Sequence, residues 1–344
     1  MYKIIEEGKA KVNVPKEEKI SAKLPVFYNP VMKFNRDMSV LLINSVDDKE
    51  IDAALALAGT GVRGVRLLKE TKKTKKVFFN DMSKEAIRII EKNLVGNKIA
   101  KSKYEIFNEE ANDFMRKVKF NYIDIDPFGT PNPFLDMVCK KAGRNSIVAI
   151  TATDTAPLAG TYINACKRKY WALPKKDANM HETGLRILIR KVQLVAAQYD
   201  KAMVPMFSYY KDHYFRIFFR CIKGKKEVDK VQKQHDMFNG AGPLWTGSLN
   251  DKALVMKMKK NNDIEDNQKF LETLYEETRI NQLGFYDIHE IAKKIKIKNI
   301  PGFELLFDKI KKRKYKVSRT IFSKTGIKSD ICYDELVKIL NSTK

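Results

Sequence analysis

The sequence has few of the residues that build metal sites and disulfides. Its 344 residues include four cysteines and four histidines, and no two cysteines form a Cys-x-x-Cys pair. This spacing excludes a zinc site built from neighbouring ligands, so we expect no metal. We expect Cys139, Cys166, Cys221 and Cys332 to be reduced and buried, as is usual in the cytosol.

The chain also lacks long apolar segments. Although 44% of its residues are hydrophobic, no run approaches the roughly 20 apolar residues that a membrane-spanning helix needs. Residues 1–20 are charged and contain no apolar core of a signal peptide. We therefore expect a globular protein of the cytoplasm, with no membrane partner.

Positive charge, by contrast, is in excess. The chain has 66 Lys and Arg against 42 Asp and Glu, a net charge of +24. Such an excess indicates a polyanionic partner, unless it reflects a generally lysine-rich proteome. Residues 293–328 hold 13 of the basic residues and only two acids, so we expect phosphate contacts there. The densest group is Lys311, Lys312, Arg313 and Lys314.

The length of the chain predicts two domains. A charged connector at 223–234 and a Gly/Pro cluster at 240–247 place the boundary near residue 238. We expect an α/β domain over residues 1–238. Short helical patterns followed by a basic strand at 315–322 predict a smaller, winged-helix-like α+β domain over 239–344, which binds nucleic acid.

A glycine-rich loop follows an apolar strand that begins near residue 50. Gly59, Gly61 and Gly64 fit the pattern Gly-x-Gly-x-x-Gly, and the next strand ends at Asp81, 20 residues after Gly61. The glycines allow close approach of a ligand, and the acid binds two ribose hydroxyls. The pattern predicts a nucleoside-containing cofactor, either a dinucleotide or S-adenosylmethionine.

A third strand, at 104–107, ends in the polar segment Asn108-Glu-Glu110-Ala111-Asn112. An acid or amide at the end of this strand could contact the amine of an adenine. The alternative is a solvated acidic loop.

The fourth strand, 121–125, ends at Asp126-Pro127-Phe128-Gly129. Proline stops the strand because it cannot donate a ladder hydrogen bond. The Asp126 carboxylate and the Pro127 carbonyl can each accept one N–H of an exocyclic amine, and Phe128 can stack on its ring. These groups suit a planar base, although a strand-ending turn with a buried Phe is the alternative.

The remaining strands indicate the class of cofactor. A fifth strand spans 146–151, a helix begins near His181, and two strands at 203–210 and 214–222 are joined by a tight turn. Five alternating strand and helix units closed by an antiparallel hairpin are the layout of class I methyltransferases, which have a Rossmann-like fold. This layout favours S-adenosylmethionine over NAD.

Together, several segments resemble the tRNA guanine-N(2) dimethyltransferases. They are Pro25-Val-Phe27-Tyr-Asn-Pro30, Asn35-Arg36-Asp37, Thr60-Gly-Val-Arg63-Gly64, Asp126-Pro-Phe-Gly-Thr-Pro131, Thr151-Ala-Thr-Asp154, Tyr210-Lys-Asp-His-Tyr-Phe-Arg216, Gly242-Pro-Leu-Trp245 and Arg319-Thr-Ile-Phe-Ser-Lys-Thr-Gly-Ile-Lys328. The resemblance runs nearly end to end. It implies dimethylation of the guanine at position 26 of tRNA, with S-adenosylmethionine as the methyl donor.

The resemblance also implies roles for individual residues. Asp126 serves the target amine, and Phe27 and Phe128 flank the base. Some members of the family carry a cysteine cluster before the Gly-Pro-Leu-Trp segment, but residues 222–245 contain no cysteine here, so zinc is not expected. The residues expected to hold the cofactor are Arg36, Arg63, Asp81, Glu110 and Ala111.

Three other functions remain open at this point. A methyltransferase for adenine or cytosine amines in DNA could use the same Asp-Pro-aromatic segment. An NAD-dependent dehydrogenase fits the glycine loop but gives the basic surface no purpose. A non-catalytic RNA-binding protein would retain tRNA without binding a cofactor.

Overall fold

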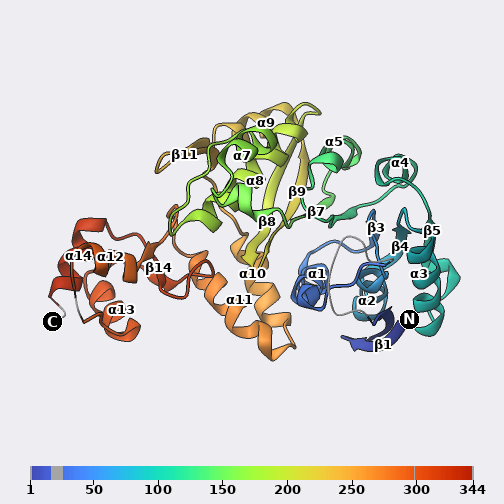
Figure 1. Cartoon of the computed structure of the whole chain (residues 1–344), viewed down its shortest axis with the longest axis horizontal. Coiled ribbons are helices and arrows are strands. Elements are labelled where there is room, and N and C mark those ends of the chain that lie inside the picture. The colour runs from blue at the N-terminus through green and yellow to red at the C-terminus, as the bar shows by residue number, and fades with distance from the viewer. Residues whose placement is uncertain (1, 17–25, 298, 343–344) are drawn as a thin grey trace. The chain divides into compact units, whose positions relative to one another are not determined.

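The structure, a computed structural model, describes residues 2–16, 26–297 and 299–342 (Figure 1). The expectation for Pro25 lies outside these residues. Two compact units are present. The first unit comprises residues 1–154, 192–206 and 214–233, and the second comprises 155–191, 207–213 and 234–344. All of 239–344 therefore falls in the second unit, together with three shorter segments that precede it.

A seven-stranded sheet has the order β5-β4-β3-β6-β7-β9-β8. The strands from β5 to β7 pair in parallel, and β9 is antiparallel to β7. This arrangement confirms the five parallel strands and the closing antiparallel strands expected from the sequence. The strands are β3 (Ile51–Leu55), β4 (Thr74–Asn80), β5 (Tyr104–Phe107), β6 (Tyr122–Ile125), β7 (Ile147–Ala152), β8 (Lys201–Lys211) and β9 (Tyr214–Lys223).

The central strands are buried along their whole length. Every residue of β6 and β7 is buried, which is typical of parallel strands covered on both faces. The helices that follow or precede the strands of the first unit are α1 (Lys33–Ser45), α2 (Val62–Glu70), α3 (Lys84–Gly96), α4 (Ala111–Lys117), α5 (Asn132–Lys141) and α9 (Lys225–Gln232), with short 3-10 turns at Pro30–Met32 and Lys101–Lys103. In the described residues, no helix is long and apolar enough to cross a membrane.

Residues 2–15 form an antiparallel hairpin of β1 (Tyr2–Glu7) and β2 (Ala10–Pro15). The buried Glu7 at the end of β1 accepts hydrogen bonds from Arg36 Nε and Nη2, both at 2.6 Å, and from Arg66 Nη1 at 3.0 Å. Burial would raise the pKa of Glu7, but the two guanidinium groups lower it to about 2. The hairpin is thus attached to α1 and α2 by buried ion pairs.

The second unit is mostly helical. Its last part is a three-stranded antiparallel sheet, in the order β12-β14-β13, packed with α12, α13 and α14 around Ile288, Leu306, Ile310, Ile327 and Leu336. The elements are α6 (Thr155–Leu158), α7 (Ile163–Tyr170), α8 (Met180–Ala197, which ends in the first unit), β10 (His235–Phe238), β11 (Ala241–Trp245), α10 (Lys252–Asn261), α11 (Glu265–Glu277), β12 (Tyr286–Asp287), α12 (Ile288–Lys294), α13 (Phe303–Lys312), β13 (Val317–Arg319), β14 (Gly326–Ser329) and α14 (Tyr333–Asn341).

Some expectations need correction. The charged connector at 223–234 contains a helix, α9, whose buried side is only Val228 and Val231. Helices α7 and α10 were not predicted from the sequence. Three of the four cysteines are buried as expected, but Cys332 is exposed.

Candidate functional site

The segment Asp126-Pro127-Phe128-Gly129 follows β6 at its carboxyl end. Gly129 has a positive φ of 78°, a conformation that favours glycine. Its N–H donates to the Thr153 hydroxyl at 2.7 Å, and its carbonyl accepts from the Thr153 N–H at 2.9 Å. The loop that follows β6 is therefore held to the loop that follows β7.

Asp126 is paired with a cation. Its carboxylate accepts a hydrogen bond from Arg63 Nη2, and its side chain is 21% exposed. Arg63 Nη1 also donates to the Asn35 side chain at 2.9 Å and to the Ser39 hydroxyl at 2.7 Å. Because α1 and α2 fix the guanidinium, the acid has a set orientation and still reaches solvent.

A second acid lies two residues earlier on the same strand. Asp124 is buried and accepts from Arg216 Nη1 at 3.0 Å and Nη2 at 2.6 Å, and its Oδ2 lies 3.5 Å from Arg63 Nε. Burial would raise the pKa of Asp124, but the two guanidinium groups hold it below its ordinary value. Asp126, Arg63, Asp124 and Arg216 thus form a chain of opposite charges beneath the cleft, and the two negative charges balance the two positive ones.

The glycine loop forms the adjoining wall of this cleft. Gly59 has a φ of 55°, and a Cβ there would lie 2.8 Å from the Phe27 carbonyl oxygen, so only glycine allows the two backbones to approach. Gly61, with a φ of 74°, precedes the first turn of α2. The Thr60 hydroxyl is buried and has no hydrogen-bond partner among the described residues. An orphaned hydroxyl in a cleft indicates a place for a polar ligand.

Asp81 stands at the end of β4, as the sequence predicts for a ribose-binding acid. Its carboxylate accepts from the Gly59 N–H at 2.8 Å and from the Ser83 N–H at 3.0 Å. Burial raises its pKa despite these backbone donors. An ionised carboxylate has about four acceptor sites, so Asp81 can also accept from a ribose hydroxyl. Together with the Thr60 hydroxyl and the glycine backbone, this donor and acceptor set fits a nucleoside.

Two aromatic rings contact each other at the cleft. The centroids of Phe27 and Phe128 are 4.2 Å apart and their planes are inclined by 68°. Phe128 is 50% exposed, so the alternative of a buried Phe in a plain turn is wrong. The sequence analysis placed both rings beside the base, and the structure brings them together.

The other residues expected to contact the cofactor are Arg36, Glu110 and Ala111, and each of them also has a structural role in the protein. Arg36 lines the cleft, but its guanidinium is held by Glu7 and donates to the Asn29 carbonyl at 3.1 Å. Glu110 is exposed and caps α4 by accepting from Asn112 and Asp113 backbone N–H groups, and Ala111 is buried as the first residue of that helix.

The structure brings only part of the expected set into one cleft. The lining includes Phe27, Arg36, Gly59, Arg63 and Asp126. The basic residues 311–314 belong to the second unit, at the end of α13, where all four are exposed and Arg313 is paired with Glu335 at 2.6 Å. Among the residues described, no group of His, Cys, Asp and Glu could hold a metal ion.

Sequence reasoning missed Asp124 and Arg216 as parts of the site. Asp124 could have been found, because an acid two residues before Asp126 in an alternating strand lies on the same face. Arg216, in the apolar strand Tyr214–Phe219, carried a similar signal, since a charge inside such a strand needs a buried partner.

Comparison with known proteins gives consistent results. The family model described as N2,N2-dimethylguanosine tRNA methyltransferase matches residues 8–240 and 232–341. A tRNA (guanine(26)-N(2)/guanine(27)-N(2))-dimethyltransferase of Aquifex aeolicus is 36% identical over 97% of this chain and 95% of its own. A tRNA (guanine(26)-N(2))-dimethyltransferase of Methanobrevibacter smithii is 36% identical over 99% of both. The solved structure of Trm1 from Pyrococcus horikoshii in complex with S-adenosyl-L-methionine has a TM-score of 0.89, at 33% identity, over 98% of this chain and 99% of that one.

Proposed function

This chain belongs to the N2,N2-dimethylguanosine tRNA methyltransferase family, and from that membership we propose that it transfers methyl groups from S-adenosylmethionine to the exocyclic amine of guanine 26 in tRNA, giving dimethylguanosine. The observation that carries the proposal is the half-exposed Phe128 next to Asp126, whose carboxylate is oriented by Arg63 at the mouth of the glycine-lined cleft. An acid and a ring so placed can hold a planar base by its amine.

The residues that would hold the cofactor lie on the wall that adjoins Asp126. When bound, S-adenosylmethionine supplies an electrophilic methyl group on its sulfonium. Gly59 and Gly61 would let it approach the protein backbone, Thr60 would offer a hydroxyl, and Asp81 would accept from a ribose hydroxyl. Arg36 and Arg63 line the cleft, and each would donate a further N–H to a carboxylate. Glu110 and Ala111, at the first turn of α4, lie after β5, where an adenine would be read.

Asp126 and Pro127 act on the amine itself. The nitrogen is a poor nucleophile because its lone pair is delocalised into the ring. If the Asp126 carboxylate and the Pro127 carbonyl each accept one N–H, the nitrogen becomes pyramidal and its lone pair points at the methyl group. Orientation of this kind supplies much of the rate. A C–N bond forms, a C–S bond breaks, and Asp126 accepts the proton that nitrogen loses.

The second transfer differs from the first. Monomethylated guanine has one N–H left, so only one of the two acceptors can be engaged. We expect Asp126 to be that acceptor, because a carboxylate forms stronger hydrogen bonds than a neutral carbonyl.

A base inside an RNA stem cannot reach this cleft while it is stacked, so it must be extruded, at a cost of a few kcal/mol. The contact between Phe27 and Phe128 implies that the exposed Phe128 ring moves when the base enters. Stacking on aromatic rings, worth about 1–3 kcal/mol per base, then offsets part of the cost of extrusion.

We assign tRNA binding to residues 239–344. The order of β12, α12, α13, β13 and β14 supports the winged-helix-like expectation, and the exposed end of α13 supplies Lys311, Lys312, Arg313 and Lys314 for phosphates. Because the substrate is tRNA, the enzyme works in the cytoplasm.

The test is mass spectrometry of nucleosides after incubation of unmodified tRNA with the protein and S-adenosylmethionine. We expect dimethylguanosine, and sequencing of the product places it at position 26. Because the Aquifex relative is named for positions 26 and 27, both positions are read. Methylated adenine or cytosine, or no methylated guanine at all, would contradict the proposal. DNA, and NAD with a nicotinamide absorbance assay, serve as the substrates of the rival functions.

A further inference from the structure

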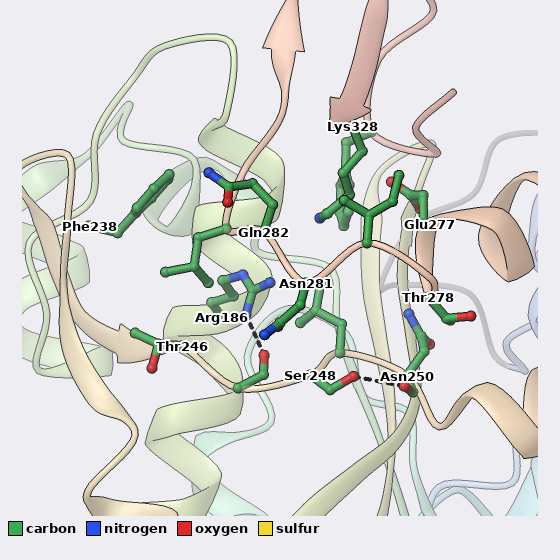
Figure 2. A pocket seen from close by; sticks show the side chains of 15 residues that line it. Arg186, Phe238, Thr246, Ser248, Asn250, Glu277, Thr278, Asn281, Gln282 and Lys328 are labelled. Atoms are coloured by element: carbon green, nitrogen blue, oxygen red, sulfur yellow. Dashed lines mark hydrogen bonds between the residues drawn. The ribbon is translucent and has the colours of Figure 1, made fainter. Parts of the chain in front are cut away.

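The second unit contains a cavity that the methyl transfer does not use. It has a volume of about 670 Å³ and lies between the end of α11, the loop after β11, and residues of α8, β10 and β14 (Figure 2). Its labelled walls include Phe238, Asn250, Glu277, Asn281, Gln282 and Lys328. The volume lies in the range of about 300–1,000 Å³ that small-molecule sites occupy.

Part of the charge around this cavity is structural. Glu182 is buried and accepts from Arg186 Nε at 2.9 Å and from the Gly284 N–H at 3.0 Å, and Lys328 Nζ lies 3.4 Å from both of its oxygens. Arg186 also donates to the carbonyls of Trp245 and Gly247. Arg186 is thereby committed to the fold, whereas the Lys328 ammonium has long contacts and faces the cavity.

Glu277 is different, because it is buried without a complete set of partners. It is 6% exposed, and its Oε1 atom has no hydrogen-bond partner in the described part of the chain. Burial raises its pKa to about 7, although Lys328 acts in the opposite direction. Glu277 lines the cavity, and a buried carboxyl oxygen without a donor indicates a missing N–H or O–H.

The other walls suit a flat, polar ring. Asn250, Asn281 and Gln282 bring side-chain amides, each of which can donate and accept, and Phe238 brings an aromatic ring. Asn281 and Gln282 are exposed and lie on the loop after α11, so an entering group reaches them first. Proteins that read RNA bases combine such groups, with stacking on a ring and hydrogen bonds to the edge of an unstacked base.

We infer that this cavity receives a second, unstacked base of the tRNA, distinct from the methylated guanine, with Glu277 accepting its ring N–H and Lys328 donating to the carbonyl oxygen beside it. Guanine and uracil both present a ring N–H next to a carbonyl. The inference rests on the proposed function, and it makes the cavity a reader of tRNA structure away from the reaction.

The first experiment measures tRNA affinity at several salt concentrations. Glu277→Gln keeps the shape of the side chain but can place an amide N–H against the N–H of the base. We expect tRNA binding to weaken about tenfold, within the range given by one base contact. The salt slope should be unchanged, because a base contact releases no counterions.

Two further variants separate recognition from folding. The double change Asn281→Ala and Gln282→Ala alters only exposed side chains and should weaken tRNA binding in the same way. Glu276→Gln is the matched control, because Glu276 is the exposed neighbour of Glu277 on α11 and does not line the cavity. Wild-type affinity in both Glu277→Gln and the double variant would overturn the inference.

The second experiment identifies the base. A carbodiimide reagent modifies the ring N–H of unpaired guanine and uracil. In the wild-type complex and in Glu276→Gln, one such base besides the target should be protected, and the protection should be lost in Glu277→Gln. If no second base is protected, the inference is wrong.

Free guanosine and uridine are tested on the protein without tRNA. If one of them binds and Glu277→Gln abolishes only that binding, the occupant is a free nucleoside and the assignment to tRNA is overturned. Methylation by the wild-type protein distinguishes failure of the proposed function from failure of the second base site alone. A protein that methylates guanine 26 while its variants bind tRNA normally retains the proposed function and loses only the second base site.

Discussion

The guanidinium of Arg63 donates to the carboxylate of Asp126, and the same guanidinium lies 3.5 Å from Asp124 through its Nε atom. One side chain from α2 therefore connects the acid proposed for catalysis with the acid buried beneath it. Because Arg216 neutralises Asp124 from β9, Arg63 is left to balance Asp126. The orientation of the Asp126 carboxylate is therefore set by the sheet and by helices α1 and α2, as well as by the loop that carries it.

Replacing Asp126 should stop the chemistry and spare binding. Asp126→Ala removes an acceptor of the amine, and we expect methyl transfer to fall at least ~100-fold, the lower end of what a general base contributes. Affinity for tRNA should fall by no more than about tenfold, the range of one base contact, because phosphate contacts supply most of the affinity. Transfer of labelled methyl groups and filter binding measure the two effects, and unchanged turnover would remove Asp126 from the mechanism.

Gly59→Ala should damage the cofactor cleft. The residue has a φ of 55°, and the new Cβ would meet the Phe27 carbonyl oxygen at 2.8 Å. The left-handed backbone alone costs roughly 1–2 kcal/mol for a residue with a side chain. We expect a lower melting temperature and weaker binding of S-adenosylmethionine in calorimetry.

The control for this change is Gly96→Ala. A Cβ at Gly96, the last residue of α3, has nothing within 4 Å. Alanine also favours a helix by up to about 1 kcal/mol over glycine. The control should melt at the wild-type temperature or above it and bind the cofactor normally. Equal behaviour of the two variants would contradict the role given to the backbone at Gly59.

Charge reversal at the end of α13 should weaken tRNA binding through the phosphates. Lys311, Lys312 and Lys314 are changed to Glu, and Arg313 is left in its ion pair with Glu335. Each lost phosphate contact should lower the salt slope by about 1. Affinity is measured at salt concentrations from about 50 to about 200 mM.

A triple variant at Lys225, Lys226 and Lys233, which are exposed at α9 of the first unit, changes the net charge equally. It should leave the salt slope nearly at the wild-type value. If both triple variants reduce the slope alike, the effect belongs to net charge and residues 311–314 have no special contact.

Glu277 should make stability depend on pH in one direction. Its pKa is about 7 in the folded protein, against an ordinary value of 4.5, with burial as the main cause. A raised pKa means that the stabilisation is complete below pH 4.5 and is lost as the pH rises through 7. At about 1.4 kcal/mol per pKa unit, the loss approaches roughly 3 kcal/mol.

The measurement is the difference in unfolding between the wild type and Glu277→Gln at pH values from about 5 to 8. His235, whose burial lowers its pKa to about 4, acts in the opposite direction but is common to both proteins and cancels. We expect the wild type to lose stability relative to the variant as the pH rises. A pH-independent difference would show that Glu277 does not titrate in this range.

The local patterns of the sequence were sufficient for most of the methyltransferase fold. Most of the strands from β3 to β9 are largely apolar runs that end at glycine or at polar residues, so their existence and order followed from short-range rules. Helix α9 was read as a connector because only Val228 and Val231 form its buried side. A helix with so narrow an apolar side resembles a charged loop in sequence.

The site was harder to predict from local patterns, because its side chains interact with residues that are distant in the sequence. Arg36 was expected at the cofactor, and its bond to Glu7 depends on a hairpin 29 positions away. Glu277 looked like one more acid in a helical pattern. Its burial arises from a fold that brings β14 and α8 beside the end of α11, and no local pattern contains that information.

The ion pairs of Glu7 also bear on how the protein is made. The hairpin leaves the ribosome before α1, α2 and α3, so Glu7 is made before its partners Arg36 and Arg66. Asn13 is made before Asn93, its hydrogen-bond partner 80 positions later. During synthesis, the Glu7 carboxylate and the Asn13 amide of the hairpin therefore lack their final partners until α3 has emerged. The hairpin can therefore take its final place only after α3 has been translated, although it precedes that helix in the chain.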